Sequence, residues 1–259
     1  MIDIPKKKFL FFIFLFLFFN FSSGKTTSVL ITTKIEKNMF PPSWNRKPIS
    51  ASVTPLGQDE EKRFYAVLEK SLKKYPPYFA AKYIKKIYLL KTMSFYQKKY
   101  GGTSAVTLKY LYLTNEGEEK GYTDQYLENA FHHEFHHLIQ NLEPSLFQRY
   151  QTLWRKINPK KFKYGQGGKD ALGTTLASLL WEKKYQKQGF LTPYSTSHIN
   201  EDFAVLTASL FSETKKLLKT AENHPLLQKK ITLLIHFYGE LHPDFTEAYF
   251  KNLDIERDL

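Results

Sequence analysis

The sequence of 259 residues contains no cysteine. It therefore forms no disulfide bond, offers no thiolate to a metal ion and carries no cysteine for lipid attachment. Any transition metal would have to be bound by histidine, aspartate or glutamate side chains. The chain has eight histidines, and four of them lie within residues 132–137.

Acidic residues are also few, because 25 Asp and Glu stand against 38 Lys and Arg and leave a formal net charge of +13. The lysines occur as scattered pairs and not as one basic stripe interleaved with aromatic residues. Such pairs are typical of solvated surfaces, so we expect no nucleic-acid binding. Aromatic residues make up 16% of the chain, which argues against a disordered protein.

The N-terminus carries an apolar run that is too short to span a membrane. Residues 6–8 are lysines, residues 9–19 are all apolar, and residues 22–24 are small. A spanning helix needs about 20 apolar residues. We therefore interpret residues 1–24 as a secretory signal peptide. The protein is expected to be exported, to the periplasm or beyond, with no stable membrane span after cleavage.

The remaining chain divides into a sheet-forming part and a helical part. Residues 25–58 are rich in Thr, Ser and Pro and are predicted to be an extended lead-in to one domain over residues 59–259. The apolar periodicity predicts a helix over residues 59–74 and strands in KIYLLKTMSFY and AVTLKYLYLT. Further helices are predicted over residues 124–142, 145–157, 171–188, 200–219, 225–241 and 243–253. A small mixed sheet followed by helices is an α+β fold.

The helix predicted over residues 124–142 contains two histidine pairs, His132/His136 and His133/His137. Either pair places its imidazoles one turn apart, close enough to bind one ion. Glu134 distinguishes the pairs, because it completes H-E-x-x-H with His133 and His137. This motif supplies two metal ligands and a general base, although short motifs also occur by chance. We interpret His132 and His136 as surface residues or as neighbours of the ligands.

A catalytic zinc ion usually has three protein ligands, so a third one must come from elsewhere in the chain. Glu143 lies at the end of the same helix, where its side chain is poorly oriented toward His133 and His137. Glu182 and Glu213 lie in segments that resemble solvated surfaces. Glu201 opens a helix that is apolar on most sides, where a carboxylate needs a partner. Glu201 is the candidate third ligand; the alternative is that it only favours the helix N-terminus electrostatically.

Two segments, FHHEFHHL and GFLTPYSTSHINEDFAVLTASLF, resemble the signatures of the bacterial "putative zinc-binding metallopeptidases". These are gluzincins, in which two His and one Glu bind zinc. The second segment is also similar to the catalytic domain of anthrax-type lethal factor. The resemblance implies a zincin-like fold with the H-E-x-x-H helix at its centre. It also implies one Zn²⁺ on His133, His137 and Glu201, with Tyr194 donating a hydrogen bond to the oxyanion.

The chain departs from this family at Val205, where a glutamate is common. The groups that orient the ligands must then come from elsewhere, and Asp202, His198 and Asp170 are candidates. Many members of the family are also lipoproteins, for which this chain lacks the cysteine.

We therefore expect an exported zinc metallopeptidase that hydrolyses peptide or protein substrates with Glu134 as the general base. The strand over residues 107–114 is expected to be an edge strand that pairs with an extended peptide. Two alternatives remain open. One is a zinc-binding protein of the same fold without turnover, which the valine at position 205 suggests. The other is a helical scaffold with incidental histidines.

Overall fold

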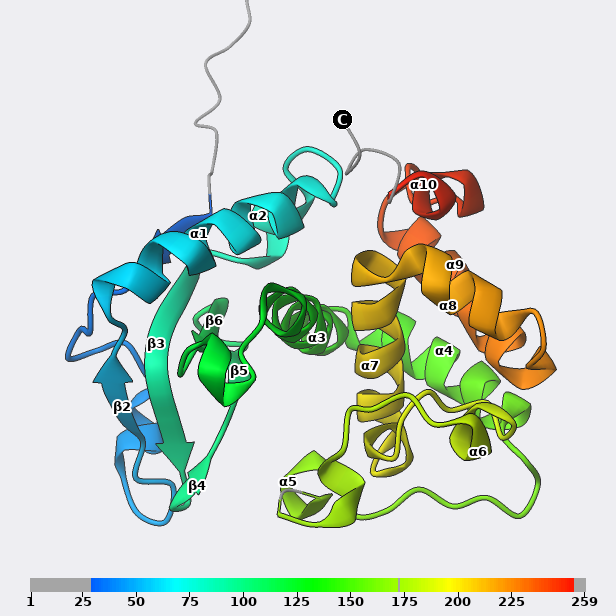
Figure 1. The fold of residues 1–259 in the computed structure, drawn as a ribbon, viewed down its shortest axis with the longest axis horizontal. Helices are drawn as coiled ribbons and strands as arrows, with labels where there is room; N and C mark the ends of the chain where they lie inside the picture. Colours follow the sequence, from blue (N-terminus) through cyan, green and yellow to red (C-terminus); the bar gives the residue numbers. More distant parts are fainter. Residues whose placement is uncertain (1–28, 172, 254–259) are drawn as a thin grey trace, which may run out of the picture.

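The computed structural model describes residues 29–171 and 173–253, and the predicted signal peptide lies outside them. Within this part of the chain, no helix is both long and apolar enough to cross a membrane. A sheet forms one half of the molecule and a group of helices forms the other, with α3 (Asp124–Leu142) between them (Figure 1). The predicted α+β class is confirmed.

The sheet is mixed, and its strand order is β1-β3-β6-β5, with β2 and β4 pairing onto β3. Its strands are β1 (Leu30–Thr32), β2 (Ser52–Pro55), β3 (Lys86–Phe95), β4 (Lys98–Lys99), β5 (Gly102–Ala105) and β6 (Tyr110–Thr114). β1 and β6 run parallel to β3, whereas β5 runs antiparallel to β6. The segment expected as an extended lead-in therefore contributes β1 and β2 to the sheet.

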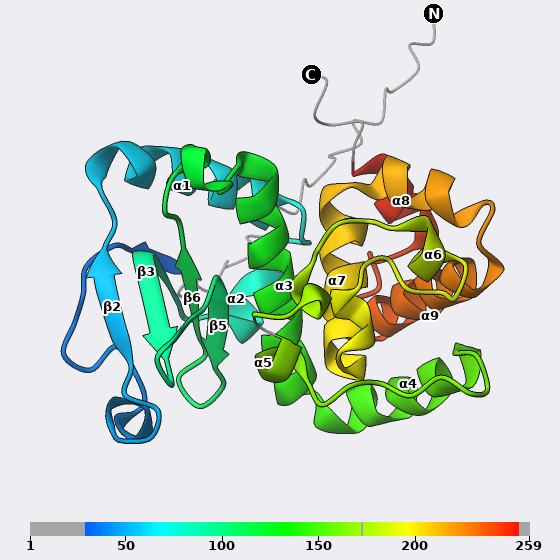
Figure 2. The same ribbon diagram turned by 60° about the horizontal axis from the view of Figure 1, so that its bottom comes forward.

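The expectation that residues 107–114 form an edge strand is wrong. β6 begins at Tyr110, because a turn precedes it in which Lys109 has a φ of 57°. β6 pairs with β3 on one side and with β5 on the other, so it lies inside the sheet. The strand at this edge is β5, which packs beside α3 (Figure 2).

The predicted helices occur in the predicted order, with two corrections, and two further short helices, over residues 79–83 and 168–171, were not predicted. Those before and beside the sheet are α1 (Gln58–Lys73) and α2 (Phe79–Tyr83). Those of the helical half after α3 are α4 (Pro144–Ile157), α5 (Gly168–Ala171), α6 (Lys183–Gln186), α7 (Ile199–Ser212), α8 (Thr214–Ala221), α9 (Pro225–Leu241) and α10 (Glu247–Asn252). The helix predicted over residues 200–219 is divided at Glu213 into α7 and α8.

The helix predicted over residues 171–188 is wrong, since the described residues of this range form only the end of α5 at Ala171, the turn η3 (Thr175–Ala177) and the short α6. Gly173 has a φ of 81°, a conformation that ends a helix. The hydroxyl of Thr174 donates to the carbonyl of Ala171 and accepts from the amide of Leu176. Such local hydrogen bonds compete with those of a helix.

His132 and His136 are not surface residues, because both side chains are completely buried. The ring of His132 stacks on Phe211, with centroids 5.2 Å apart. The ring of His136 stacks on Phe203, and its Nδ1 lies 3.1 Å from the hydroxyl of Thr207. All three partners belong to α7, so these two histidines pack α3 against α7.

A buried ion pair lies beside His132 and joins the end of α1 to α3. The Nζ of Lys74 is 2.5 Å from a carboxylate oxygen of Glu128, and both side chains are about one-tenth exposed. Burial opposes the negative charge of Glu128. The hydrogen bond from His132 and the charges of His132 and Lys74 outweigh it and lower the pKa of Glu128 to about 2.

We expect Glu128→Gln to lower the free energy of unfolding by about 3 kcal/mol at neutral pH, because it leaves a buried lysine without its anion. The folded pKa lies below the ordinary value of 4.5. The stabilisation is therefore present above about pH 4.5 and is lost as the pH falls toward 2. Urea denaturation from pH 7 to pH 3 should show the free energies of unfolding of the wild type and the variant converging.

The control is Glu247→Gln, which removes an exposed ion pair with Lys251 and should change the free energy of unfolding little at any pH. A difference that stays constant with pH would contradict the assignment.

Candidate metal centre

The helix α3 presents its histidines from a well-defined frame. It begins at Thr123, whose hydroxyl accepts a hydrogen bond from the amide of Tyr126, and it ends before Pro144. One stripe of the helix is fully buried in the core and consists of Leu127, Phe131, Phe135, Leu138 and Ile139. His133 and His137 project from another face, where each side chain keeps 16% of its exposure.

Three predicted ligand atoms converge at this face. The Nε2 atoms of His133 and His137 are 3.0 Å apart, and they lie 3.1 and 3.2 Å from the same carboxylate oxygen of Glu201. Zinc bonds of about 2.1 Å at a tetrahedral angle place ligand atoms ~3.4 Å apart. The observed separations differ from this value by a few tenths of an ångström. Two imidazoles and a carboxylate are also a donor set that zinc accepts, so these residues fit a zinc ion.

The charges at this site favour a cation. Burial opposes the charge of Glu201, but His137 and His133 outweigh it and hold the pKa of Glu201 well below its ordinary value. Burial likewise disfavours a charged His137, yet the Glu201 carboxylate raises the pKa of His137 to about 9. Glu201 is thus an anion at neutral pH, and a metal ion would take the place of a proton between these groups.

Glu134 and Tyr194 lie beside the three ligand atoms. Burial raises the pKa of Glu134, against the opposing charges of His137 and His133. Tyr194 opens the turn η4 (Tyr194–Thr196), and its ring centroid is 6.2 Å from that of His133. Burial, followed by the charges of Glu201 and Glu134, raises the pKa of Tyr194, so its hydroxyl remains protonated and able to donate.

Two glycines allow the backbone to approach these side chains closely. A β-carbon at Gly102, the first residue of β5, would lie 2.6 Å from Cγ of Glu134. A β-carbon at Gly168 would lie 2.6 Å from Oε1 of Glu201 and would collide with the hydroxyl of Tyr194. Larger residues at these positions would therefore displace the functional groups themselves.

The group that orients His137 is Gln140, which the sequence analysis missed. Its side-chain amide lies 3.0 Å from Nδ1 of His137. The atom that faces Nδ1 is the amide nitrogen Nε2, and Oε1 of Gln140 is buried without a hydrogen-bond partner among the described residues. A ring that presents Nε2 to a metal carries its proton on Nδ1, so metal binding would require the amide to turn and present Oε1 as the acceptor. The position could have been found from sequence, because residues three apart on a helix are neighbours.

The candidates named for this role lie elsewhere. The carboxylate of Asp202 accepts hydrogen bonds of 2.7 Å from Lys230, Trp154 and Tyr164, away from the histidines. The Nδ1 of His198 accepts from the amide of Asn200 and caps α7. The side chain of Asp170 is exposed.

A cleft of about 340 Å³ opens onto the ligand atoms. One of its walls is Thr103 and Ser104 of β5, and another is the loop that contains Gln166, Gly167 and Gly168. The rest of the cleft is lined by His198 and Asn200, at the start of α7, and by Glu134, His137 and Glu201. We call it the metal cleft.

The fold and the site define the class of this protein: an α+β domain with an H-E-x-x-H helix and a glutamate from a later helix. Residues 74–241 match the family described as "putative zinc-binding metallo-peptidase", and the chain belongs to this family. A crystal structure of a "putative zinc-binding metallo-peptidase" from Bacteroides caccae has a similar fold. Its TM-score is 0.52, at 15% identity over 88% of this chain and 87% of that one. No curated protein matches the sequence.

Substitution of Gly168 by alanine tests the geometry of the site. The added methyl group forces Glu201 or Tyr194 to move, so we expect a zinc affinity roughly 10- to 100-fold weaker. The melting temperature should change little, because the groups that move are the flexible ends of side chains. Gly57→Ala is the matched control, since a β-carbon there would meet no atom within 4 Å. Chelator competition measures the affinity, and an unchanged value in Gly168→Ala would refute the close approach.

Proposed function

We propose that this protein is a zinc-dependent metallopeptidase that hydrolyses peptide bonds in peptide or protein substrates. The observation that carries the proposal is the convergence of His133, His137 and Glu201, with the carboxylate of Glu134 in the same cleft. A zinc ion held by these ligands would polarise the substrate carbonyl and make a water molecule more acidic. The N-terminal 24 residues support the further proposal that the enzyme acts outside the cytoplasm.

Glu134 is the general base in this mechanism. Its carboxylate removes a proton from the attacking water and then delivers that proton to the leaving amine. Burial raises its pKa toward the range in which one group both accepts and returns a proton. The backbone of β5 at Gly102 packs directly against the Glu134 side chain, because Gly102 has no side chain to separate them.

Tyr194 is the oxyanion donor in this mechanism. Burial keeps its hydroxyl protonated at neutral pH, and the hydroxyl lies close to the Glu201 carboxylate, since a β-carbon at Gly168 would meet both groups. A donor that is already in place stabilises negative charge at little reorganisation cost.

The edge strand β5 is the proposed docking strand for substrate. Among the described strands, β5 pairs with β6 and its other edge faces the cleft through Thr103 and Ser104. An extended peptide can add to such an edge through backbone hydrogen bonds. This arrangement would carry the scissile bond past Glu134.

A zinc-binding protein without turnover is the second candidate function. It is favoured by Val205, which is buried in the apolar core where the family often has an acidic residue. Gln140 offers a substitute for that acidic residue at His137. Activity measurements on the metal-loaded protein distinguish the two candidates.

Glu134→Gln should reduce peptide hydrolysis by a factor of about 10² to 10⁴, because the amide cannot accept the proton of water. Zinc content should stay at the wild-type level, since Glu134 is not among the three converging ligands. The test is a cleavage assay on a peptide library, with metal content measured on the same samples. A zinc-loaded wild type that cleaves no peptide would favour the protein without turnover.

Tyr194→Phe should lower kcat by roughly 100-fold while changing KM little, because the lost hydrogen bond forms mainly with the oxyanion. Tyr78→Phe serves as the control, since Tyr78 is 68% exposed and does not line the cleft. Steady-state kinetics with one cleaved peptide suffice. Equal values of kcat for Tyr194→Phe and the wild type would remove Tyr194 from the mechanism.

A further inference from the structure

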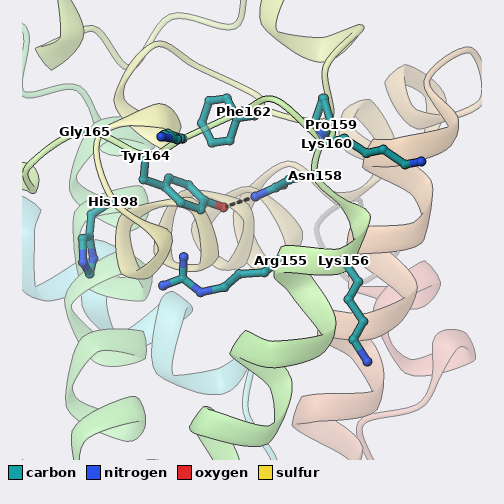
Figure 3. A pocket seen from close by; sticks show the side chains of 10 residues that line it. Arg155, Lys156, Asn158, Pro159, Lys160, Phe162, Tyr164, Gly165 and His198 are labelled. Carbon is teal, nitrogen blue, oxygen red and sulfur yellow. Dashed lines mark hydrogen bonds between the residues drawn. The ribbon is translucent and has the colours of Figure 1, made fainter.

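A second cavity of about 550 Å³ lies where α4 ends and the following loop begins (Figure 3). Its lining includes four cationic side chains, and none of the described residues that line it is acidic. We call it the basic cavity; it is lined by Arg155, Lys156, Asn158, Pro159, Lys160, Phe162, Lys163, Tyr164, Gly165 and His198.

Within the part of the chain that the structure describes, the cations of the basic cavity are not paired with carboxylates. Arg63 and Arg149 each form ion pairs with glutamates at 2.6 Å. Among the residues that the structure describes, no carboxylate forms an ion pair with Arg155 or with the three lysines of the cavity. A concave surface lined by charges of one sign concentrates the electric field and attracts ions of the opposite sign.

Arg155 is the cation best placed to bind a ligand. Its guanidinium lies 5.9 Å from the ring centroid of Tyr164 and extends toward His198, whereas Lys156 and Lys160 extend away (Figure 3). The Tyr164 ring is itself fixed, because its hydroxyl donates to Asp202 and accepts from Asn158. Contact with a fixed aromatic ring restricts the guanidinium before any ligand binds.

The basic cavity adjoins the metal cleft. His198 lines both. The loop between them is held by backbone hydrogen bonds from Gly165 to Thr196 and from Gly167 to Ser197. The lining residues of the basic cavity and of the metal cleft differ in charge. The cleft is lined by Glu134 and Glu201 and, among its described residues, by no lysine or arginine.

We propose that the basic cavity binds a carboxylate side chain of the peptide substrate, so that this peptidase prefers acidic peptides. The inference rests on the proposed peptidase function and assigns it a substrate class. The planar guanidinium of Arg155 matches a carboxylate with two parallel hydrogen bonds, and the lysines add attraction at the rim. An aspartate or glutamate of a bound peptide is attracted past His198 to Arg155.

The test uses the zinc-loaded full-length protein and pairs of peptides that differ by one Glu→Gln change near the scissile bond. The position of the change is chosen from library cleavage. We expect kcat/KM to be about tenfold higher for the acidic peptide, as a charge-assisted hydrogen bond implies. Arg155→Gln should abolish this preference by lowering kcat/KM for the acidic peptide to the value found for its neutral partner. Arg149→Gln, on the same helix but paired with Glu240, should retain the preference.

Binding measurements separate this proposal from the peptidase function. Fluorescence anisotropy with Glu134→Gln reports affinity without hydrolysis, on the same peptides or, where none is cleaved, on Glu and Gln pairs of a library peptide selected by binding to this variant. The double variant Glu134→Gln/Arg155→Gln reports the contribution of Arg155. A tenfold preference for the acidic peptide that disappears in the double variant supports the basic cavity, even if the wild type cleaves nothing. Equal affinity for both peptides, or a preference that survives the loss of Arg155, overturns it, even if the wild type is an active peptidase.

Discussion

The site depends on how α3 packs against α7, because the three predicted metal ligands are divided between these two helices. Phe203, Thr207 and Phe211 recur every fourth residue along α7 and contact the buried His136 and His132. This contact fixes the distance and rotation of the two helices. Glu201, two residues before Phe203, is thereby brought to His133 and His137. The two histidine pairs thus differ in their contacts: His133 and His137 face Glu201 on α7, whereas His132 and His136 pack α7 against α3.

Much of this arrangement could be predicted from sequence because its signals are local. Thr123 and Pro144 mark the ends of α3, and the observed bounds agree with the predicted ones. The spacing of His133, Glu134 and His137 is set by the helix itself. The three side chains predicted to be ligands do converge in the structure. Their roles in zinc binding and catalysis are proposals that the measurements above test.

The features that could not be predicted depend on partners far away in the chain. A histidine on the flank of an amphipathic helix is equally compatible with solvent and with burial. His132 is buried because Tyr75 and Phe211 meet it, 57 residues before and 79 residues after it in the sequence. The edge strand β5 is similarly invisible, because Gly102 and its short polar neighbours have little apolar alternation and are ordered by pairing with β6. Residues 174–182 show the reverse case, since Leu176, Leu179 and Leu180 have the i, i+3, i+4 spacing of a helix face but remain exposed.

Two acidic residues, Glu201 and Asp202, lie in the first turn of α7, but only Glu201 faces the predicted metal site. Successive residues of a helix point about 100° apart, so Asp202 is turned away from the histidines when Glu201 faces them. Its buried charge is compensated by Lys230 on α9 and by hydrogen bonds from Trp154 on α4 and from Tyr164. Removing one partner from such a buried pair is costly, so Asp202 restrains the first turn of α7 against both neighbouring helices. The Tyr164 ring that this anchor fixes is also the ring beside Arg155. The position of Glu201 and the shape of the basic cavity therefore both depend on the same buried carboxylate.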